Sequence, residues 1–305
     1  MSNNWFKNLV CLGITKIGVS VDELETLLSK QGLQACPINE MQSVGWLAPK
    51  GVGEPFVHRS QGQMLIALGT EKKVLPGAVI NQFVKERAVG LEEQTGVKVG
   101  RKALKEMKER VTEELLARAF VIQSRTMAWI DPVGGWLVVN ASSSSKADEL
   151  LEALRKVLDV ELLSMALVST KVSPSQAMTG WLAGGEPPVG FTVDRDCELR
   201  GSGEEKATVR YAHHDLEAEE IPKHIEAGKQ ATKLALTWKD KISFVLTDSF
   251  ELKRISPLDV MKEQSAEAED QFDGDFAMMS GEISLMLADL VTALGGLEKP
   301  VAAHV

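Results

Sequence analysis

The fold class is decided by residues 98–140, which read KVGRKALKEMKERVTEELLARAFVIQSRTMAWIDPVGGWLVVN. In the first half, Leu104, Met107, Val111 and Leu115 recur at helical spacing, which predicts an amphipathic helix over 98–120. In the second half, two apolar runs flank Asp-Pro-Val-Gly-Gly, which is typical of a β-hairpin. A helix followed by an antiparallel hairpin favours an α+β fold.

The predicted helix also sorts its charge by face. Residues 98–110 hold six basic and two acidic residues. Five of the cations fall on or beside one stripe: Lys98, Arg101, Lys102, Lys105 and Lys108. Such a row matches a phosphate backbone, because duplex DNA carries roughly one charge per 1.7 Å of its axis. A solvated surface helix is the plainer interpretation of the same pattern.

Toward the N-terminus, the pattern predicts short strands and helices with clear boundaries. A strand is expected over 6–14 and another over 63–68. Ser20 and Glu23 form a capping box that opens a helix ending at Gly32. A second helix, over 79–91, is separated from the basic helix by Gly96 and Gly100. These two helices form a predicted helical arm over about 77–119.

Toward the C-terminus, Ser145 with Asp148 is expected to cap a helix that runs through Leu158. Residues 174–190 are rich in glycine and proline and are interpreted as a linker. This gives an N-terminal α+β region over 1–173 and a C-terminal α+β region over 191–305.

Within the C-terminal region, strands are predicted over 191–199 and 207–211. Asp215 is expected to cap a helix that continues through residues 225–233, and Lys229 and Lys233 would then share one helical face. The alternating residues 234–246 predict a hairpin, extended by 251–255. A last helix is expected over 281–294.

Composition is that of an ordinary globular chain with a local excess of acid. The 305 residues include 34 Lys+Arg and 43 Asp+Glu, a net charge of −9. Residues 259–298 contain ten acidic residues and one basic residue, so the remainder of the chain is neutral. A neutral body of this kind can still carry a basic surface.

Several function classes find no support in the sequence. No run of 18 apolar residues predicts a membrane span, and no signal peptide is recognisable. Three distant cysteines indicate reduced thiols in a cytoplasmic protein. Neither a phosphate loop nor zinc spacing is present, so no cofactor or metal is expected. Asp270, Asp273 and Asp275 miss the spacing of a calcium loop and are interpreted as an acidic turn.

One constellation leaves an enzymatic alternative open. Asp248, Glu251 and Lys253 resemble the Asp and Glu-x-Lys of metal-dependent nucleases, in which carboxylates hold Mg²⁺ and the lysine helps activate water. Here Asp248 lies only three residues before Glu251, which is tighter than that layout usually allows. Charged residues beside a hairpin are the plainer reading.

Further basic residues occur outside the predicted arm helix, in separate elements. They are Lys72, Lys73, Arg118, Arg125, Lys229, Lys233, Lys253 and Arg254. Scattered cations usually serve solubility, and they form a binding surface only where the fold brings them together.

Taken as a whole, the chain resembles a known family, the bacterial recombination-associated protein RdgC. The similar blocks cover nearly the whole length and occur in order. They include Trp5 to Leu9, Glu71 to Pro76, Arg101-Lys102, Leu115-Leu116, Arg118 to Phe120, Ser145 to Ala147, Cys197 to Leu199, Asp215-Leu216, His224 to Lys229, Thr232 to Leu236, Leu252 to Arg254 and Leu294 to Gly296.

The resemblance implies a non-enzymatic, nucleoid-associated protein of the cytoplasm. It implies a homodimer closed into a ring around duplex DNA, which binds without strong sequence preference and restrains RecA-driven strand exchange. A basic hole inside an acidic ring would reconcile the net charge with DNA binding. The DNA contacts expected on this basis are the five stripe cations with Lys72, Lys73, Arg118, His213, His214, Lys229, Lys233, Lys253 and Arg254.

The same resemblance suggests a dimer interface. Phe120 is expected either to fill the local core or to pack across the second contact of the ring. Ile283, Leu287 and Leu290 of the last helix are expected either to pack inside one subunit or to pair with a partner's tail.

Two positions depart from the family pattern. His213-His214 stand where the family usually has a basic residue and Gln, so a DNA contact there is expected to be weaker and pH-dependent. Ala117 replaces a proline, and the arm helix is therefore expected to run on without its usual break.

Overall fold

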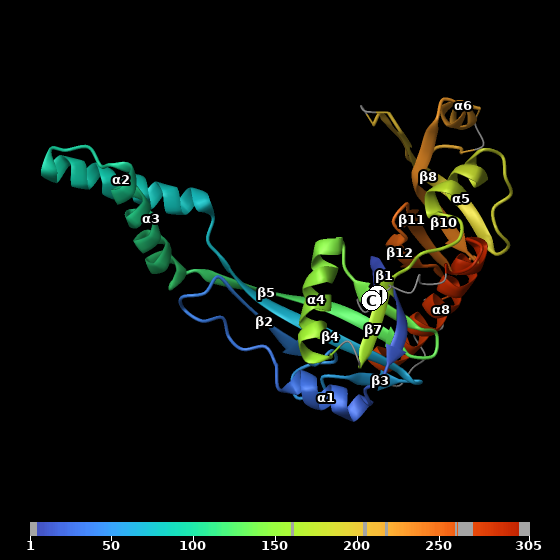
Figure 1. Cartoon of the computed structure of the whole chain (residues 1–305), viewed down its shortest axis with the longest axis horizontal. Helices are drawn as coiled ribbons and strands as arrows, with labels where there is room; N and C mark the ends of the chain where they lie inside the picture. The colour runs from blue at the N-terminus through green and yellow to red at the C-terminus, as the bar shows by residue number, and fades with distance from the viewer. Residues whose placement is uncertain are drawn as a thin grey trace, which may run out of the picture. The chain divides into compact units, whose positions relative to one another are not determined.

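The computed structural model describes residues 5–159, 162–203, 206–216, 219–259, 261 and 271–298. The described residues form seven helices and twelve strands. Figure 1 labels most of them. The helices are α1 (Val21–Ser29), α2 (Gly77–Thr95), α3 (Arg101–Leu116), α4 (Ser144–Val157), α5 (Pro174–Leu182), α6 (Glu220–Glu226) and α8 (Gln271–Ala293).

The strands alternate with these helices along the chain, which makes the fold mixed α+β, as predicted. They are β1 (Leu9–Ile17), β2 (Gln42–Leu47), β3 (His58–Ser60), β4 (Gln63–Val74), β5 (Phe120–Asp131), β6 (Trp136–Asn140), β7 (Leu163–Leu167), β8 (Phe191–Gly201), β9 (Thr208–Tyr211), β10 (Lys229–Trp238), β11 (Ile242–Thr247) and β12 (Glu251–Pro257).

The chain divides into two compact units. The larger unit comprises residues 1–24, 57–66 and 126–305, and the smaller unit comprises residues 25–56 and 67–125. This division differs from the predicted regions 1–173 and 191–305, because β1 of the first predicted region pairs with β12 of the second within one unit.

The core of the larger unit lies between antiparallel strands and two helices. Its strands follow the order β6-β1-β12-β11-β10-β8-β9, and β7 also pairs with β1. Apolar side chains of α5 and α8 join those of β8, β10 and β11 in one hydrophobic cluster. Burial of this apolar surface is the main driving force for folding of the unit. In addition, the indole N–H of Trp238 donates to Asp289 of α8 over 2.9 Å.

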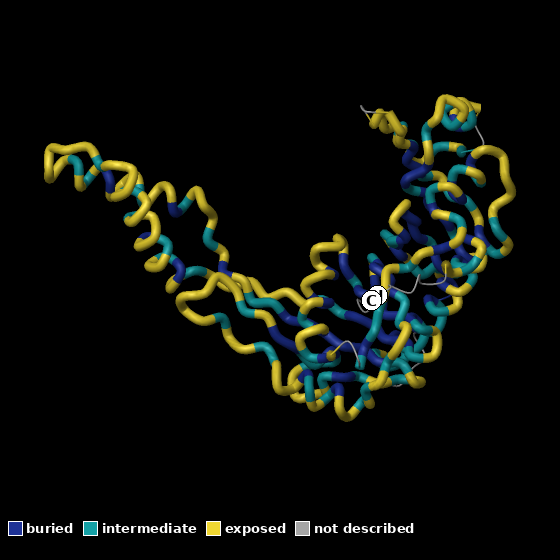
Figure 2. Tube along the Cα trace, viewed as in Figure 1, coloured by how far each residue is buried: buried dark blue, intermediate teal, exposed yellow. Residues whose placement is uncertain are grey.

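The smaller unit combines a strand pair with the helical arm. Strand β2 pairs with β4 in antiparallel register, from Gln42 opposite Lys72 to Leu47 opposite Ala67. We use "arm" for α2, α3 and the loop between them, residues 77–116. Figure 2 shows most of the arm as exposed. Its helices contribute only Ile80, Ala88, Val111 and Leu116 as buried residues.

Elements with strong local signals agree with the predictions. The Ser20 backbone N–H donates to Glu23 over 2.9 Å, and the Glu23 N–H donates back to the Ser20 hydroxyl over 3.2 Å, which confirms the capping box. Residues 120–140 form a β5–β6 hairpin, and residues 229–247 form a β10–β11 hairpin. Gly96 ends α2 in the left-handed conformation, with φ of 69°.

Three predictions of helix boundaries were wrong. Helix α3 begins at Arg101, so Lys98 lies in the loop that Gly100 closes. It ends at Leu116, so Ala117 does not extend it, and the chain enters β5 at Phe120. Helix α4 is capped by Ser143, not by Ser145, because the Ser143 hydroxyl accepts the Lys146 N–H.

The prediction of a helix from Asp215 to Lys233 was also wrong over much of its length. Helix α6 ends at Glu226, and Gly228 follows with φ of 85°, a left-handed turn that glycine adopts without strain. Lys229 and Lys233 therefore lie on strand β10 and share no helical face. The pairing of β10 with both β8 and β11 outweighs the local helical pattern.

The predicted linker and tail differ from the sequence expectation. Pro174–Leu182 forms a helix, α5, because Ser173 caps its N-terminus and Pro174 is suited to the first helical position. Ala177, Met178 and Leu182 of this helix are buried. The last helix, α8, begins at Gln271 rather than at Gly281. Of the acidic segment 259–298, residues 260 and 262–270, including Asp270, lie outside the described part.

Helix α8 is long and apolar enough to cross a membrane by length and composition alone, and no other described helix is. Core helices of globular proteins meet the same criteria. Here Phe276, Ile283, Leu287 and Leu290 pack in the hydrophobic cluster of the larger unit. We therefore interpret α8 as a core helix.

Candidate nucleic-acid interface

The arm is held together by a narrow apolar seam and one ion pair. Val111 and Leu116 of α3 are buried, as their helical spacing predicts. The Arg87 guanidinium of α2 donates to both carboxylate oxygens of Glu114 over 3.1 and 2.5 Å. These contacts keep α3 beside α2 and leave the polar face of α3 in solvent.

The exposed face of the arm carries unpaired cations. Arg101, Lys102, Lys105 and Lys108 of α3 are exposed, as is Lys98 in the preceding loop. Within the described chain, none of the five side chains forms an ion pair or a hydrogen bond with another residue. Because their charges are not neutralised by the protein, they are available to an anionic partner.

The three other predicted cations of the smaller unit divide into two kinds. Lys72 and Arg118 are exposed. Lys73 is only 5% exposed, and its ammonium donates to the carbonyls of Pro37 and Ile38 over 2.5 and 2.6 Å. The prediction of a DNA contact for Lys73 does not fit this geometry, because the buried ammonium donates to two carbonyls of the segment around Pro37 and Ile38.

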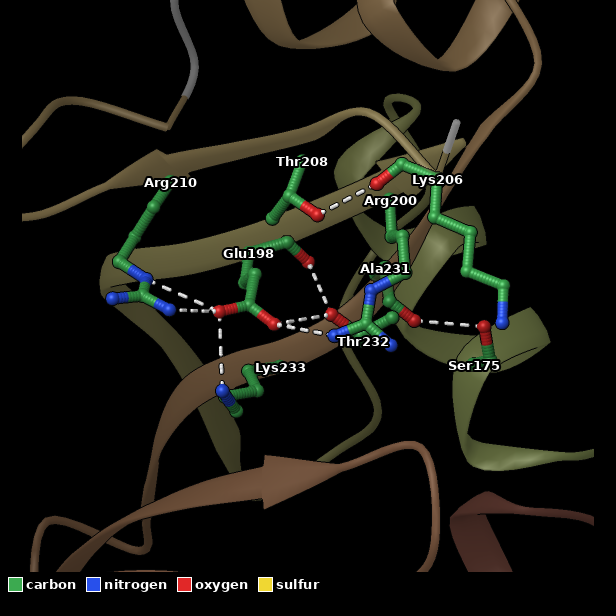
Figure 3. Close-up of polar contacts among 9 residues, drawn as sticks. All are labelled: Ser175, Glu198, Arg200, Lys206, Thr208, Arg210, Ala231, Thr232 and Lys233. Carbon is green, nitrogen blue, oxygen red and sulfur yellow. Dashed lines mark hydrogen bonds and ion pairs between the residues drawn. The ribbon is translucent and has the colours of Figure 1, made fainter. Parts of the chain in front are cut away.

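The larger unit holds a group of cations around one buried carboxylate, which we call the Glu198 cluster (Figure 3). Its members are Glu198 and Arg200 on β8, Arg210 on β9, and Thr232 and Lys233 on β10.

Three cations of this cluster converge on the two oxygens of Glu198. Arg210 donates from Nε and Nη2 to Oε2 over 3.1 and 2.6 Å, and Lys233 reaches the same oxygen over 3.1 Å. Arg200 approaches Oε1 at 3.4 Å, and the Thr232 hydroxyl donates to Oε1 over 2.9 Å. The carboxylate side chain is 3% exposed, whereas that of Arg210 is 70% exposed. The cluster therefore turns its negative charge inward and its positive charges outward.

Strand register explains how residues so far apart in sequence meet. Glu198 lies directly opposite Arg210 in the β8–β9 pair and opposite Lys233 in the β8–β10 pair. Between Ala231 and Lys233 the register of β10 shifts by one residue. This bulge places both Thr232 and Lys233 across from Glu198, so that both side chains reach its carboxylate.

The ionisation of Glu198 reflects this environment. Burial alone would raise the pKa of its carboxyl, but the hydrogen bonds from Arg210, Lys233 and Thr232 outweigh burial and lower the pKa to about 2. Glu198 therefore stays ionised at neutral pH, and its three partner cations exceed its charge by two.

A pocket of about 390 Å³ lies beside the cluster. Its lining includes Asp196, Glu198, Arg210, Lys233, Lys253 and Arg254. Arg254 is exposed and pairs with Asp196 over 3.3 Å. Four cations and two carboxylates give this wall a positive balance.

The histidines and Lys229 lie in the same unit. His213 is exposed, and its backbone N–H donates to Asp196 over 2.9 Å, which is the main cause of a lowered pKa of that carboxyl. The His214 ring lies 2.8 Å from the Asp215 carbonyl. Lys229 is half-buried, and its ammonium lies 3.3 Å from the Nδ1 atom of His224.

Two residues of the nuclease alternative, Glu251 and Lys253, are engaged with each other and with neighbouring serines. The Lys253 ammonium pairs with Glu251 over 2.7 Å and donates to the Ser142 carbonyl over 3.1 Å, while the Ser144 hydroxyl donates to Glu251. Both side chains thus secure the junction between β6 and α4. In the described ranges, no group of three His, Cys, Asp or Glu side chains is placed to hold a metal ion.

The predicted interface residues have opposite surroundings. Phe120 is 86% exposed, and the neighbouring Val121 and Ile122 are exposed too, so Phe120 does not fill a core within the chain. Ile283, Leu287 and Leu290 are fully buried within the larger unit, which agrees with packing inside one subunit.

Sequence reasoning missed Glu198, Arg200 and Arg210 as site residues. A weak signal was present, because Glu198 and Arg200 flank one residue on a strand and Arg210 lies on the next strand. Only the register of β8, β9 and β10 shows that these residues share one cluster.

Comparisons with known proteins point in one direction. The family described as "Putative exonuclease, RdgC" matches residues 4–297. The protein named recombination-associated protein RdgC from Janthinobacterium sp. (strain Marseille) is 51% identical over 297 residues, covering 96% of this chain and 98% of the relative. Proteins of the same name from Cupriavidus necator and Bordetella pertussis are 50% identical over 300 residues and 46% identical over 297 residues, with 97% and 96% of this chain and 99% and 98% of the relatives covered. The chain belongs to the RdgC family.

Proposed function

We propose that this chain is a non-sequence-specific duplex DNA-binding protein that acts in recombination. The observation that carries the proposal is the row of exposed, unpaired cations from Lys98 to Lys108 on the arm. Cations without internal partners can bind phosphates without first breaking an ion pair, and the release of counterions from the DNA favours this binding. Contacts of this kind fix a protein on the duplex but read no sequence.

The proposal includes assembly as a homodimer that closes into a ring around the duplex. Phe120, Val121 and Ile122 support this step, because three consecutive exposed apolar residues are costly in water and are typical of an interaction site. A ring also accommodates the net charge of −9, since acidic surface can face away from the DNA.

The proposed biological effect follows from occupancy. A ring that encloses duplex DNA hinders the strand exchange that RecA promotes, simply by covering the duplex. The protein would then work in the cytoplasm, on the nucleoid, without catalysing a reaction. The family name connects the relatives with recombination.

The Mg²⁺-dependent nuclease remains the alternative, and the words of the family description keep it worth testing. The geometry gives it no added support, because Glu251 and Lys253 are engaged with each other and with Ser142 and Ser144.

The deciding experiment is a gel-shift titration of the purified protein on two unrelated linear duplexes across a salt series. We expect similar affinities for both duplexes and a log–log salt slope of about −0.9 per neutralised phosphate. A strong preference for one duplex, or a flat salt response, would contradict backbone binding. Loss of the DNA in Mg²⁺ that Glu251→Ala abolishes would favour the nuclease.

A further inference from the structure

The cations of the Glu198 cluster outnumber the carboxylate that they pair with. One carboxylate faces the cations of Arg200, Arg210 and Lys233, which leaves a local surplus of two positive charges. Arg210 spends two of its N–H groups on Glu198, and Lys233 spends one. The remaining donors of these side chains have no partner in the described chain and are partly exposed to solvent.

The position of the surplus charge is fixed by the fold rather than left to flexible side chains. Glu198 is anchored in the central strand of three, with Arg210 opposite on one side and Lys233 opposite on the other. Long basic side chains normally lose rotamer entropy when they bind a ligand. Here the buried carboxylate has already restricted the guanidinium and the ammonium, so less ordering is left for binding.

The shape and donor set indicate which anion would fit. A pocket of about 390 Å³ opens beside Arg210 and Lys233, and Arg254 and Lys253 lie on its wall. A guanidinium fork with a neighbouring ammonium suits the several oxygens of a phosphate group.

We propose that the Glu198 cluster is a phosphate-binding site for the DNA backbone, and that Glu198 is the positioning residue that holds Arg210 and Lys233 toward the phosphate. This inference rests on the proposed function, since it takes the phosphate from duplex DNA. Glu198 itself does not touch the ligand. It acts through the two cations.

If Glu198 positions the cations, the expected effect of Glu198→Gln on DNA affinity is opposite to the effect expected from net charge alone. Glu198→Gln removes one negative charge next to the site, so a purely electrostatic account expects tighter DNA binding and a steeper salt slope. If Glu198 positions the cations, the same change weakens binding, because Arg210 and Lys233 lose their shared anchor although the protein has become more positive.

The test measures fluorescence anisotropy of a labelled linear duplex with the full chain across a salt series. Arg210→Ala and Lys233→Ala each remove one cation, and each should lower affinity about eightfold at 0.1 M salt while reducing the slope by about 0.9. Glu198→Gln should lower affinity at least as much as either. Combining Glu198→Gln with Arg210→Ala should then cost less than the sum of the two effects.

Controls separate positioning from folding and from general charge. Lys223→Ala removes an exposed cation of α6 that pairs with Glu219, the residue just before the helix. This change should leave the affinity for the duplex within twofold of that of the unmodified protein. Glu198→Asp keeps the charge and should restore part of the affinity that Glu198→Gln loses. Melting curves of all variants identify any that fail to fold.

A second measurement distinguishes failure of this site from failure of DNA binding. The melting temperature is recorded with inorganic pyrophosphate as the probe, which reports the phosphate site without DNA. Unchanged or tighter duplex binding by folded Glu198→Gln would overturn the proposal while leaving the proposed function intact. Absence of duplex binding by the unmodified protein would refute the proposed function. Pyrophosphate stabilisation lost in Glu198→Gln would then show a site for free phosphates and would overturn the DNA source.

Discussion

At the scale of single residues, Glu198 links stability to pH. Its carboxyl has a pKa of about 2 in the folded chain, against about 4.3 in an unfolded one. A lowered folded-state pKa stabilises the protein above the unfolded value, and this contribution is lost as the pH falls from about 4.3 toward 2. We expect Glu198→Gln to destabilise the larger unit by roughly 1–3 kcal/mol at pH 7.

Melting curves of the unmodified protein and of Glu198→Gln at pH 7, 4 and 3 test this linkage. The difference in melting temperature should be largest at pH 7 and should shrink at each lower pH. A difference that grows on acidification would show that Glu198 is not stabilised as its anion.

Phe120 gives a second prediction at this scale. Because its side chain is 86% exposed, Phe120→Ala should leave the melting temperature almost unchanged. It should weaken dimerisation and retention on DNA if the aromatic ring anchors a contact between subunits. Light scattering over a concentration series measures the first effect, and gel-shift the second.

A matched control is Val133→Ala, which removes another exposed apolar side chain, at the tip of the β5–β6 hairpin. It should change neither dimerisation nor DNA retention. If Phe120→Ala sharply lowers the melting temperature and leaves DNA retention intact, Phe120 belongs to a core.

At the scale of elements, α3 is expected to contribute a measurable share of the salt dependence. Lys105→Glu with Lys108→Glu places two negative charges on its cationic face. Duplex affinity should fall, the salt slope should decrease by about 1.8, and the dimer mass should stay the same. Lys30→Glu with Lys223→Glu makes the same change in net charge at two other exposed positions, and a comparable loss there would assign the effect to overall charge.

The elements also show what the sequence could and could not predict. The Ser20 capping box, Gly96 and the hairpin at residues 131–135 were predictable because each signal acts within a few residues. The segment after Gly228 was not, because pairing with β8 and β11 overrides its local helical pattern.

The candidate site was predictable only in part, for the same physical reason. The cations of α3 follow from helical spacing, so sequence alone placed Arg101, Lys105 and Lys108 together. The Glu198 cluster depends on strand register and on a one-residue bulge in β10, which no spacing rule supplies. The burial of Lys73 could not be predicted, because its ammonium donates to the carbonyls of Pro37 and Ile38, more than 30 residues earlier in the chain.

At the scale of the whole molecule, assembly decides between a ring and a single subunit. We expect light scattering to give a mass near twice the 33.2 kDa of one chain. A monomer at micromolar concentration that still binds duplex DNA tightly would contradict the ring. Because Ile283, Leu287 and Leu290 are buried within one subunit, such a dimer would not be formed by pairing of these α8 side chains with those of a partner.

The narrow seam of the arm has a consequence for its motion. With four buried side chains in α2 and α3, the arm has little apolar surface to resist local opening, whereas the strands of the larger unit share an extensive core. Backbone amides of residues 77–116 should therefore exchange with deuterium well before those of β10 and β11, and bound duplex should slow the exchange of α3. The arm would then be rigid only when DNA holds it.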